Sequence, residues 1–203
     1  MLKKMVKSLV LLFLFAIVPA HAAKNKTLEG LEILRQGMSG MSDFSATIVQ
    51  EKHLALMNED LVARGVVRFK KPGLFYMELY SPYASRLLLK DNVLSYKLIN
   101  EGVREKIALP QEENLQRWTS FLARPVIALP EEGNLTAERR GELWTLHFSP
   151  QGKKGIKAFH ITFTGSGLLK KLEIEERNSD RTLIQLENMQ RNVGLTDQDF
   201  TLE

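Results

Sequence analysis

Side chains that could perform acid–base chemistry are few in this sequence. After the amino-terminal segment there are three histidines, His53, His147 and His160, and there is no cysteine. No two of the histidines stand at the short spacing of a metal-ligand pair, and a zinc site without cysteine would need distant carboxylates. His147 and His160 both alternate with apolar neighbours, so we expect them to point outward from strands.

Serine and carboxylate patterns give no stronger signal. Residues 37–40 (GMSG) and 165–167 (GSG) do not match the G-x-S-x-G turn of hydrolases. Glu173 and Glu175 alternate with Leu172 and Ile174, as on the wet face of a strand. No phosphate loop or dinucleotide fingerprint is present. We therefore predict no catalytic residue, no metal and no cofactor, and we expect that the protein is not an enzyme.

The first 22 residues have the pattern of a secretory signal. Three lysines precede an apolar stretch over residues 8–18, and Ala20-His21-Ala22 supplies small residues for cleavage after Ala22. The apolar stretch is shorter than the roughly 20 residues that span a bilayer. We expect export, with residues 23–203 as the mature protein.

Charge and cysteine content limit the partners of that mature chain. The formal net charge of +4 includes the three lysines of the leader, so the remainder is close to neutral and no nucleic-acid partner is expected. No cysteine is available to accept a lipid anchor or to form a disulfide. We expect one domain with an ordinary core, monomeric and not lipid-anchored.

Two amphipathic helices are predicted. The first covers residues 27–38, with Thr27 as its N-cap and Gly37 and Gly40 at its end. The second covers residues 112–123 and ends before Pro125. The expected apolar stripes include Leu31, Leu34 and Met38 in the first helix and Leu115, Trp118, Phe121 and Leu122 in the second.

The rest of the chain favours short antiparallel strands. Between Ala63 and Lys70 the charged residues fall on even positions and apolar residues on odd ones, which is typical of a sheet with one wet face. Turns of two to four residues separate most strands and exclude parallel crossovers. The predicted strands are 44–51, 63–70, 74–80, 86–90, 93–98, 103–109, 143–148, 157–163, 168–175 and 182–189.

About ten to eleven such strands predict an incomplete antiparallel β-barrel covered by two or more helices. Its interior is either filled by helix side chains or left as a ligand cavity, and the sequence leaves both open. The residues expected to face this interior are Phe44, Ile48, Val67, Phe69, Phe75, Met77 and Leu79.

The mature chain resembles the LolA-type family of periplasmic outer-membrane lipoprotein carriers. The resemblance rests on residues 44–52 (FSATIVQEK), on residues 65–75 (GVVRFKKPGLF), on Ser81-Pro82 and on the closing pattern from Asn192 to Phe200. No single motif is specific, but their order and spacing are.

The resemblance implies a periplasmic carrier that binds the acyl chains of a lipoprotein or a related lipid and moves them between the inner and outer membranes. It also implies an inner-membrane release complex and an outer-membrane acceptor as partners. The alternative is a sensor or receptor module on the same scaffold that does not transport.

Two residues, Phe75 and Lys71, stand at positions that are functional in the family. Phe75 matches the aromatic residue after Pro that the family uses to accept cargo. Lys71 stands where the family has a lid-latching arginine, and a lysine offers a point charge in place of a five-donor fork. The family pattern also continues beyond Phe200, whereas this sequence ends at Glu203.

Overall fold

The protein is built around one sheet of eleven antiparallel strands, seen in a computed structural model that describes residues 19–108, 133–151 and 155–202. The strands are β1 (Asp43–Leu54), β2 (Glu59–Lys70), β3 (Leu74–Leu79), β4 (Ser85–Lys90), β5 (Val93–Leu98), β6 (Val103–Ala108), β7 (Gly133–Arg140), β8 (Leu143–Pro150), β9 (Ile156–Thr164), β10 (Leu169–Glu176) and β11 (Arg181–Arg191).

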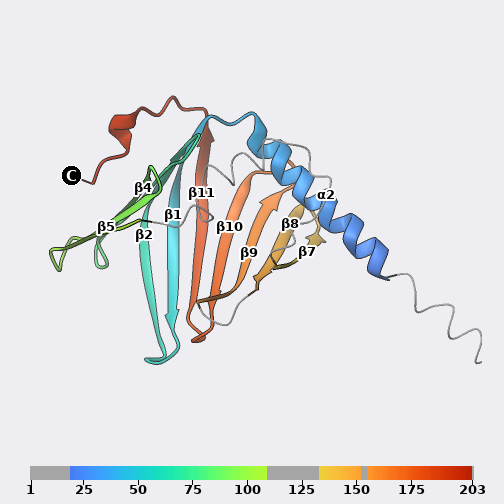
Figure 1. Cartoon of the computed structure of the whole chain (residues 1–203), viewed down its shortest axis with the longest axis horizontal. Coiled ribbons are helices and arrows are strands. Elements are labelled where there is room, and N and C mark those ends of the chain that lie inside the picture. Colours follow the sequence, from blue (N-terminus) through green and yellow to red (C-terminus); the bar gives the residue numbers. More distant parts are fainter. Residues whose placement is uncertain (1–18, 109–132, 152–154, 203) are drawn as a thin grey trace, which may run out of the picture.

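The strand order places the first and last strands side by side in the middle of the sheet. It runs β6-β5-β4-β3-β2-β1-β11-β10-β9-β8-β7, so β1 pairs with β11 and the edges are β6 and β7 (Figure 1). The two edge strands do not pair with each other, which confirms an open sheet in place of a closed barrel. The prediction of an incomplete antiparallel barrel is therefore correct in class and in strand number.

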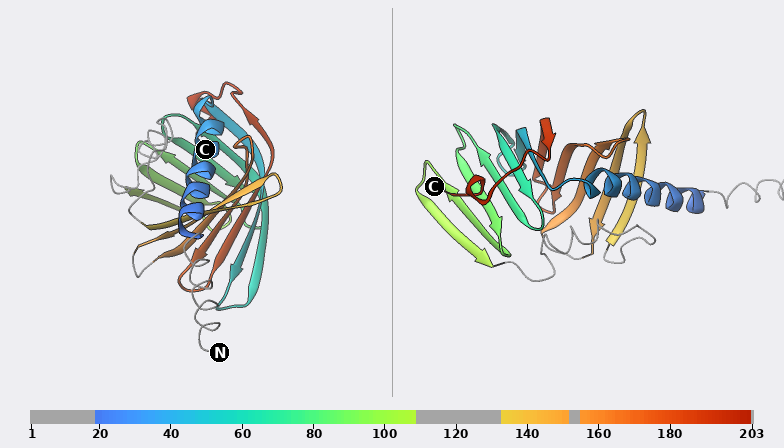
Figure 2. Two further views of the ribbon diagram at one scale, coloured as in Figure 1. Left: turned by 90° about the vertical axis from the view of Figure 1, so that its right-hand side faces the viewer. Right: turned by 90° about the horizontal axis from the view of Figure 1, so that it is seen from above.

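The sheet curves, and helix α2 (Pro19–Ser39) lies across its hollow side (Figures 1 and 2). The helix contacts β7 and β8. Among the described residues α2 is the only α-helix, and the predicted second helix over residues 112–123 falls outside them. A pair of lid helices is thus not confirmed. None of the helices in the described parts is long and apolar enough to cross a bilayer.

Period-two alternation decides which strand face is buried. On β2, Ala63, Gly65, Val67 and Phe69 are buried while the even positions are exposed or half-buried. This confirms the predicted alternation. Its inward side chains belong to a core cluster with β1 and β3, and a second cluster forms where α2 packs on β8 and β9.

The prediction that Thr27 caps the first helix is wrong. The helix begins at Pro19, eight residues earlier, because alanines with high helix propensity follow a proline that fits the first turn. Thr27 lies inside the helix and is buried. Its Oγ1 accepts a hydrogen bond of 3.2 Å from the amide of Ala137 on the edge strand β7, so the residue anchors the helix to the sheet.

Strand β7 was not predicted from the sequence. Its eight residues, GNLTAERR, contain three charges and begin with a glycine, so the apolar alternation is reduced to Leu135 and Ala137. Both side chains pack against the cluster under α2. The strand conformation of β7 therefore depends on its pairing with β8 more than on its own sequence pattern.

Candidate lipid-binding cavity

An apolar cavity of about 480 Å³ lies between α2 and the hollow side of the sheet. Its wall combines residues from the helix with residues from β1 to β3 and from β7 to β11. The lining residues are Leu31, Leu34, Met38, Phe44, Ile48, Val67, Phe75, Met77, Leu135, Leu146, Phe148, Phe159, Ile161, Leu169, Lys171, Leu172, Ile184 and Leu186.

Helix α2 forms the roof of the cavity because one side of it is apolar. Leu31, Leu34 and Met38 are three and four residues apart, so they share one side of the helix and all three reach the cavity. The helix can approach the sheet closely because two glycines meet. A Cβ placed on Gly37 lies 2.5 Å from the Cα of Gly167, which itself has a φ of +72°.

Strands β1, β2 and β3 form one wall in matched register. Phe44 stands opposite Phe69 on β2, and Phe69 stands opposite Phe75 on β3. Val67 stands opposite Met77 in the same way. Because these partners lie on one face of the sheet, their side chains form a continuous apolar surface.

Most of the residues predicted to face the interior reach the cavity. Five of the seven predicted strand residues line it, and so do the three predicted residues of the first helix. Phe69 and Leu79 face the same way but are fully packed into the core, at 5% and 6% exposure. The Phe69 ring lies against Phe44, with centroids 5.6 Å apart. Leu115, Trp118, Phe121 and Leu122 lie outside the described residues.

The opposite wall was not identified from the sequence. It comes from β7 to β11, and Leu146, Phe148, Phe159 and Ile161 are typical members. The sequence pattern indicated that these residues lie in strands. It did not indicate which face of those strands lies under α2, because that depends on the long-range pairing of the strands.

The cavity is poor in polar groups. Among the described lining residues Lys171 is the only charged one, and its Nζ lies 3.3 Å from the Glu173 carboxylate. The other seventeen are Leu, Ile, Val, Met or Phe. Apart from Lys171, the described wall offers no acid, base or nucleophile to a ligand, and it suits hydrocarbon.

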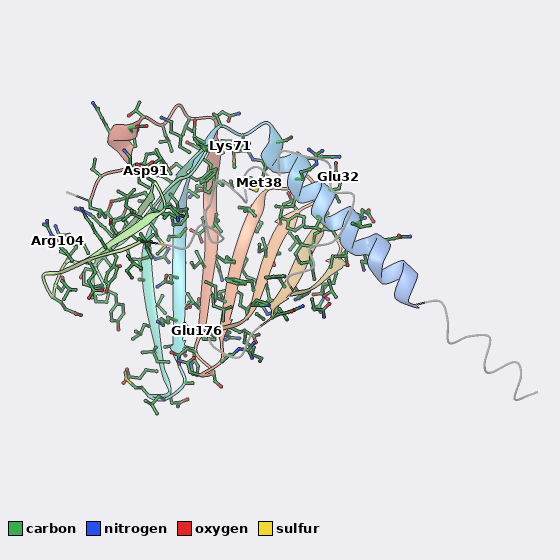
Figure 3. The ribbon with its side chains drawn as sticks, viewed as in Figure 1. Glu32, Met38, Lys71, Asp91, Arg104 and Glu176 are labelled. Atoms are coloured by element: carbon green, nitrogen blue, oxygen red, sulfur yellow. The ribbon has the colours of Figure 1, made fainter. Side chains whose placement is uncertain are left out.

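Lys71 holds the carboxyl end of the roof helix. Its Nζ donates to the carbonyl oxygens of Met38 at 2.8 Å and of Ser39 at 3.2 Å (Figure 3). Partial burial lowers the pKa of the Lys71 ammonium. Its positive charge at the carboxyl end of α2 also faces the negative end of the helix dipole.

Arg191 adds a second cation at this end, and it was not predicted from the sequence. Its Nη1 donates to the carbonyl oxygen of Gly37 at 2.9 Å. Next to it, the Asn192 side chain accepts from the amide of Ser42 and donates to the carbonyl of Gly40. The end of β11 therefore fixes both the end of α2 and the link into β1.

Comparison with known proteins agrees with this architecture. The family model described as "Outer membrane lipoprotein carrier protein LolA" matches residues 39–203. No curated protein matches the chain by sequence.

Several solved structures are similar. A DUF1329 family protein from Desulfovibrio piger has a TM-score of 0.49 at 11% identity, with 87% of this chain and 98% of that chain covered. A LolA superfamily protein from Nitrosomonas europaea has a TM-score of 0.43 at 11% identity, with coverages of 88% and 97%. An outer membrane lipoprotein-sorting protein domain from Vibrio parahaemolyticus has a TM-score of 0.44 at 12% identity, with coverages of 86% and 97%.

Proposed function

The chain belongs to the LolA family of outer membrane lipoprotein carriers, and from that premise we propose that it binds the acyl chains of a lipoprotein or related lipid and carries them between membranes. The observation that carries the proposal is the cavity of about 480 Å³ with one charged residue in its described wall. Its volume lies within the range of about 300–1,000 Å³ that ligand sites occupy.

Physical chemistry supports a guest in this cavity. Each CH₂ group moved out of water contributes about 0.8 kcal/mol, so a lipid with several chains does not cross an aqueous compartment unassisted at a useful rate. Water in this cavity finds few polar partners, so apolar chains compete with it favourably. Met38 and Met77 give its wall unbranched, adaptable side chains, which suit a ligand without fixed shape.

Location and partners are part of the same proposal. Residues 1–22 act as a cleaved signal, and residues 23–203 form a single monomeric domain in the periplasm. An inner-membrane release complex supplies the cargo and an outer-membrane acceptor receives it. The described part of the wall is apolar apart from Lys171, and it gives no support to catalysis.

Native mass spectrometry of tag-free protein taken from the periplasm tests the proposal directly. We expect a population whose mass exceeds that of the polypeptide by one lipid or acylated peptide, and which loses that mass on organic extraction. A bare polypeptide mass, even after incubation with purified lipoprotein, contradicts it. Protein that retains its cargo but never delivers it to outer-membrane vesicles favours a sensor.

A charge placed in the cavity wall provides a second test of the proposal. Phe75→Glu puts a carboxylate among apolar side chains, and burial of an unpaired charge there is strongly unfavourable. We expect lipid uptake to fall below detection while the protein remains folded, because Phe75 is only half-buried. Val62→Glu is the control, since it adds the same charge at an exposed position on the outer face of β2. Equal uptake by both variants contradicts the assignment.

A further inference from the structure

Two histidines stand opposite each other on the sheet face that points away from the cavity. His147 on β8 is the register partner of His160 on β9. Their strand neighbours Leu146 and Ile161 line the cavity, so the histidines point to the outside, as predicted. Their side chains are 34% and 20% exposed, which leaves them accessible to ions.

Each imidazole has its Nε2 directed at a carboxylate. His147 Nε2 lies 3.5 Å from Glu138 Oε1 on β7, and His160 Nε2 lies 3.3 Å from Glu175 Oε1 on β10. Glu175 also accepts a hydrogen bond of 3.0 Å from Lys157 Nζ, which fixes the position of the carboxylate. A carboxylate oxygen only accepts, so a ring that bonds to it donates from Nε2.

This arrangement turns the two Nδ1 atoms toward each other. They are 2.6 Å apart, and the rings meet edge to face with centroids 4.8 Å apart. At this distance one Nδ1 donates to the other when it carries its ring's proton. When both rings carry that proton on Nε2, the two unprotonated Nδ1 atoms are close enough to share one cation.

We propose that His147 and His160 chelate a divalent copper ion through their Nδ1 atoms. Metal-bound histidines commonly donate their second ring N–H to a carboxylate, as Glu138 and Glu175 allow here. No three His, Asp or Glu side chains in the described residues converge on one point, so water completes the coordination. An open pocket of about 690 Å³ over the pair gives those waters room.

The distance between the nitrogens selects the metal. Bonds of about 2.0–2.1 Å meeting at a right angle, as in square-planar Cu²⁺ or Ni²⁺, place the two nitrogens about 2.9 Å apart. Tetrahedral Zn²⁺ places them about 3.4 Å apart with the same bond lengths. The observed 2.6 Å is closer to the square-planar value, and Cu²⁺ leads the general affinity order. We expect the affinities to follow Cu²⁺, then Ni²⁺, then Zn²⁺.

Calorimetric titration of tag-free protein with CuCl₂ near neutral pH tests the site. The wild type is expected to bind one Cu²⁺, with an electron paramagnetic resonance spectrum showing two equivalent nitrogen ligands. His147→Gln and His160→Gln each remove one nitrogen and abolish this signal. Glu175→Gln, which removes the charged partner of His160, weakens binding about tenfold.

His53→Gln is the matched control, because His53 is a lone histidine paired with Asp60. It keeps full copper binding and the two-nitrogen spectrum. Retained binding in either test variant, or loss in the control, overturns the proposal, and so does a wild type that binds no copper and merely shares a proton between the rings. Lipid uptake is measured in parallel on every variant and stays unchanged, since the site lies on the face away from the cavity.

Discussion

Lys71 is the residue at which sequence and structure agree most usefully. Lys71 directly follows β2, and the odd-position alternation from Ala63, continued to this residue, predicts that its side chain faces inward. Its Nζ donates to two carbonyls at the end of α2. Resemblance to the carrier family added the idea of a latch, which remains a proposal. Arg191 could not be found this way, because its place beside α2 depends on the pairing of β1 with β11 and on an irregular register there.

Replacing Lys71 by methionine is expected to loosen the roof helix. The change removes two hydrogen bonds to helix carbonyls and should lower the free energy of unfolding by about 1–2 kcal/mol. Hydrogen exchange at the last turn of α2 should accelerate, and lipid exchange with it. Lys70→Met is the control, because Lys70 makes only an exposed ion pair with Asp197, worth about 0–1 kcal/mol. Equal effects on α2 from both variants would show that Lys71 is not a latch.

Among the elements, α2 depends on a backbone contact with the turn between β9 and β10. Gly37→Ala places a methyl group 2.5 Å from the Gly167 Cα, so the helix or the turn must move. We expect a loss of about 1–3 kcal/mol in urea unfolding, together with a smaller or displaced cavity. Gly40→Ala has nothing within 4 Å of its new methyl group and should change stability by less than about 0.5 kcal/mol. Similar losses in the two variants would rule out the contact as the cause.

The segment after β11 lies on the outer face of β2, where it buries Phe200 and makes polar contacts, one of which depends on pH. Lys70 donates to Asp197, and Arg68 donates to the carbonyl of Asp199. A hydrogen bond from Lys70 lowers the pKa of Asp197, and bonds from Thr196 lower that of Asp199. Both carboxylates are therefore better stabilised as anions in the folded state.

Acid should release this segment. A carboxylate with a depressed pKa contributes stability above its ordinary value of 3.8, and the contribution disappears as the pH falls through the folded pKa. Amide exchange at residues 196–200, followed to a pH of about 2, should accelerate below 3.8 while the central strands stay protected. In Lys70→Met the release should occur at higher pH, and an unshifted midpoint would exclude the ion pair as its cause.

Ten of the eleven strands were predicted. Strands such as β2 show period-two alternation with one buried face, whereas β4 and β6 have no alternating burial and were recognised from the turn residues on either side of them. Strand β7 keeps only Leu135 and Ala137 inside, so the local signal is weak. The start of α2 was misplaced because Thr27 resembles a cap, whereas its hydroxyl serves the edge strand β7.

At the scale of the molecule, the organisation rests on one pairing that no local pattern contains. Strands β1 and β11 are adjacent from Phe44↔Arg191 to His53↔Arg181, and they join the two halves of the sheet. The cavity wall is built from both halves. Prediction of strands therefore gave the class of the fold and half of the wall, while the second wall required the topology.

Truncation should expose this dependence. A chain ending at Arg191 loses the segment on the outer face, with the buried Phe200, but keeps every strand, so we expect it to fold with reduced stability. A chain ending at Asp180 loses β11 from the centre of the sheet, and we expect it to lack cooperative unfolding by circular dichroism and calorimetry. A cooperative transition in the shorter chain would show that β1 and β10 can pair directly.

The pairing of β1 with β11 also determines when the protein can complete its fold. As the chain emerges from its amino-terminal end, β1 must wait for a partner that arrives more than a hundred residues later. Contacts so distant in sequence are slow to form. Until β11 pairs with it, one hydrogen-bonding edge of β1 stays unpaired and can associate with other chains. Strand β11 is the last strand to be synthesised, and it joins the two halves of the sheet. The fold therefore cannot be completed until almost the whole chain has been made.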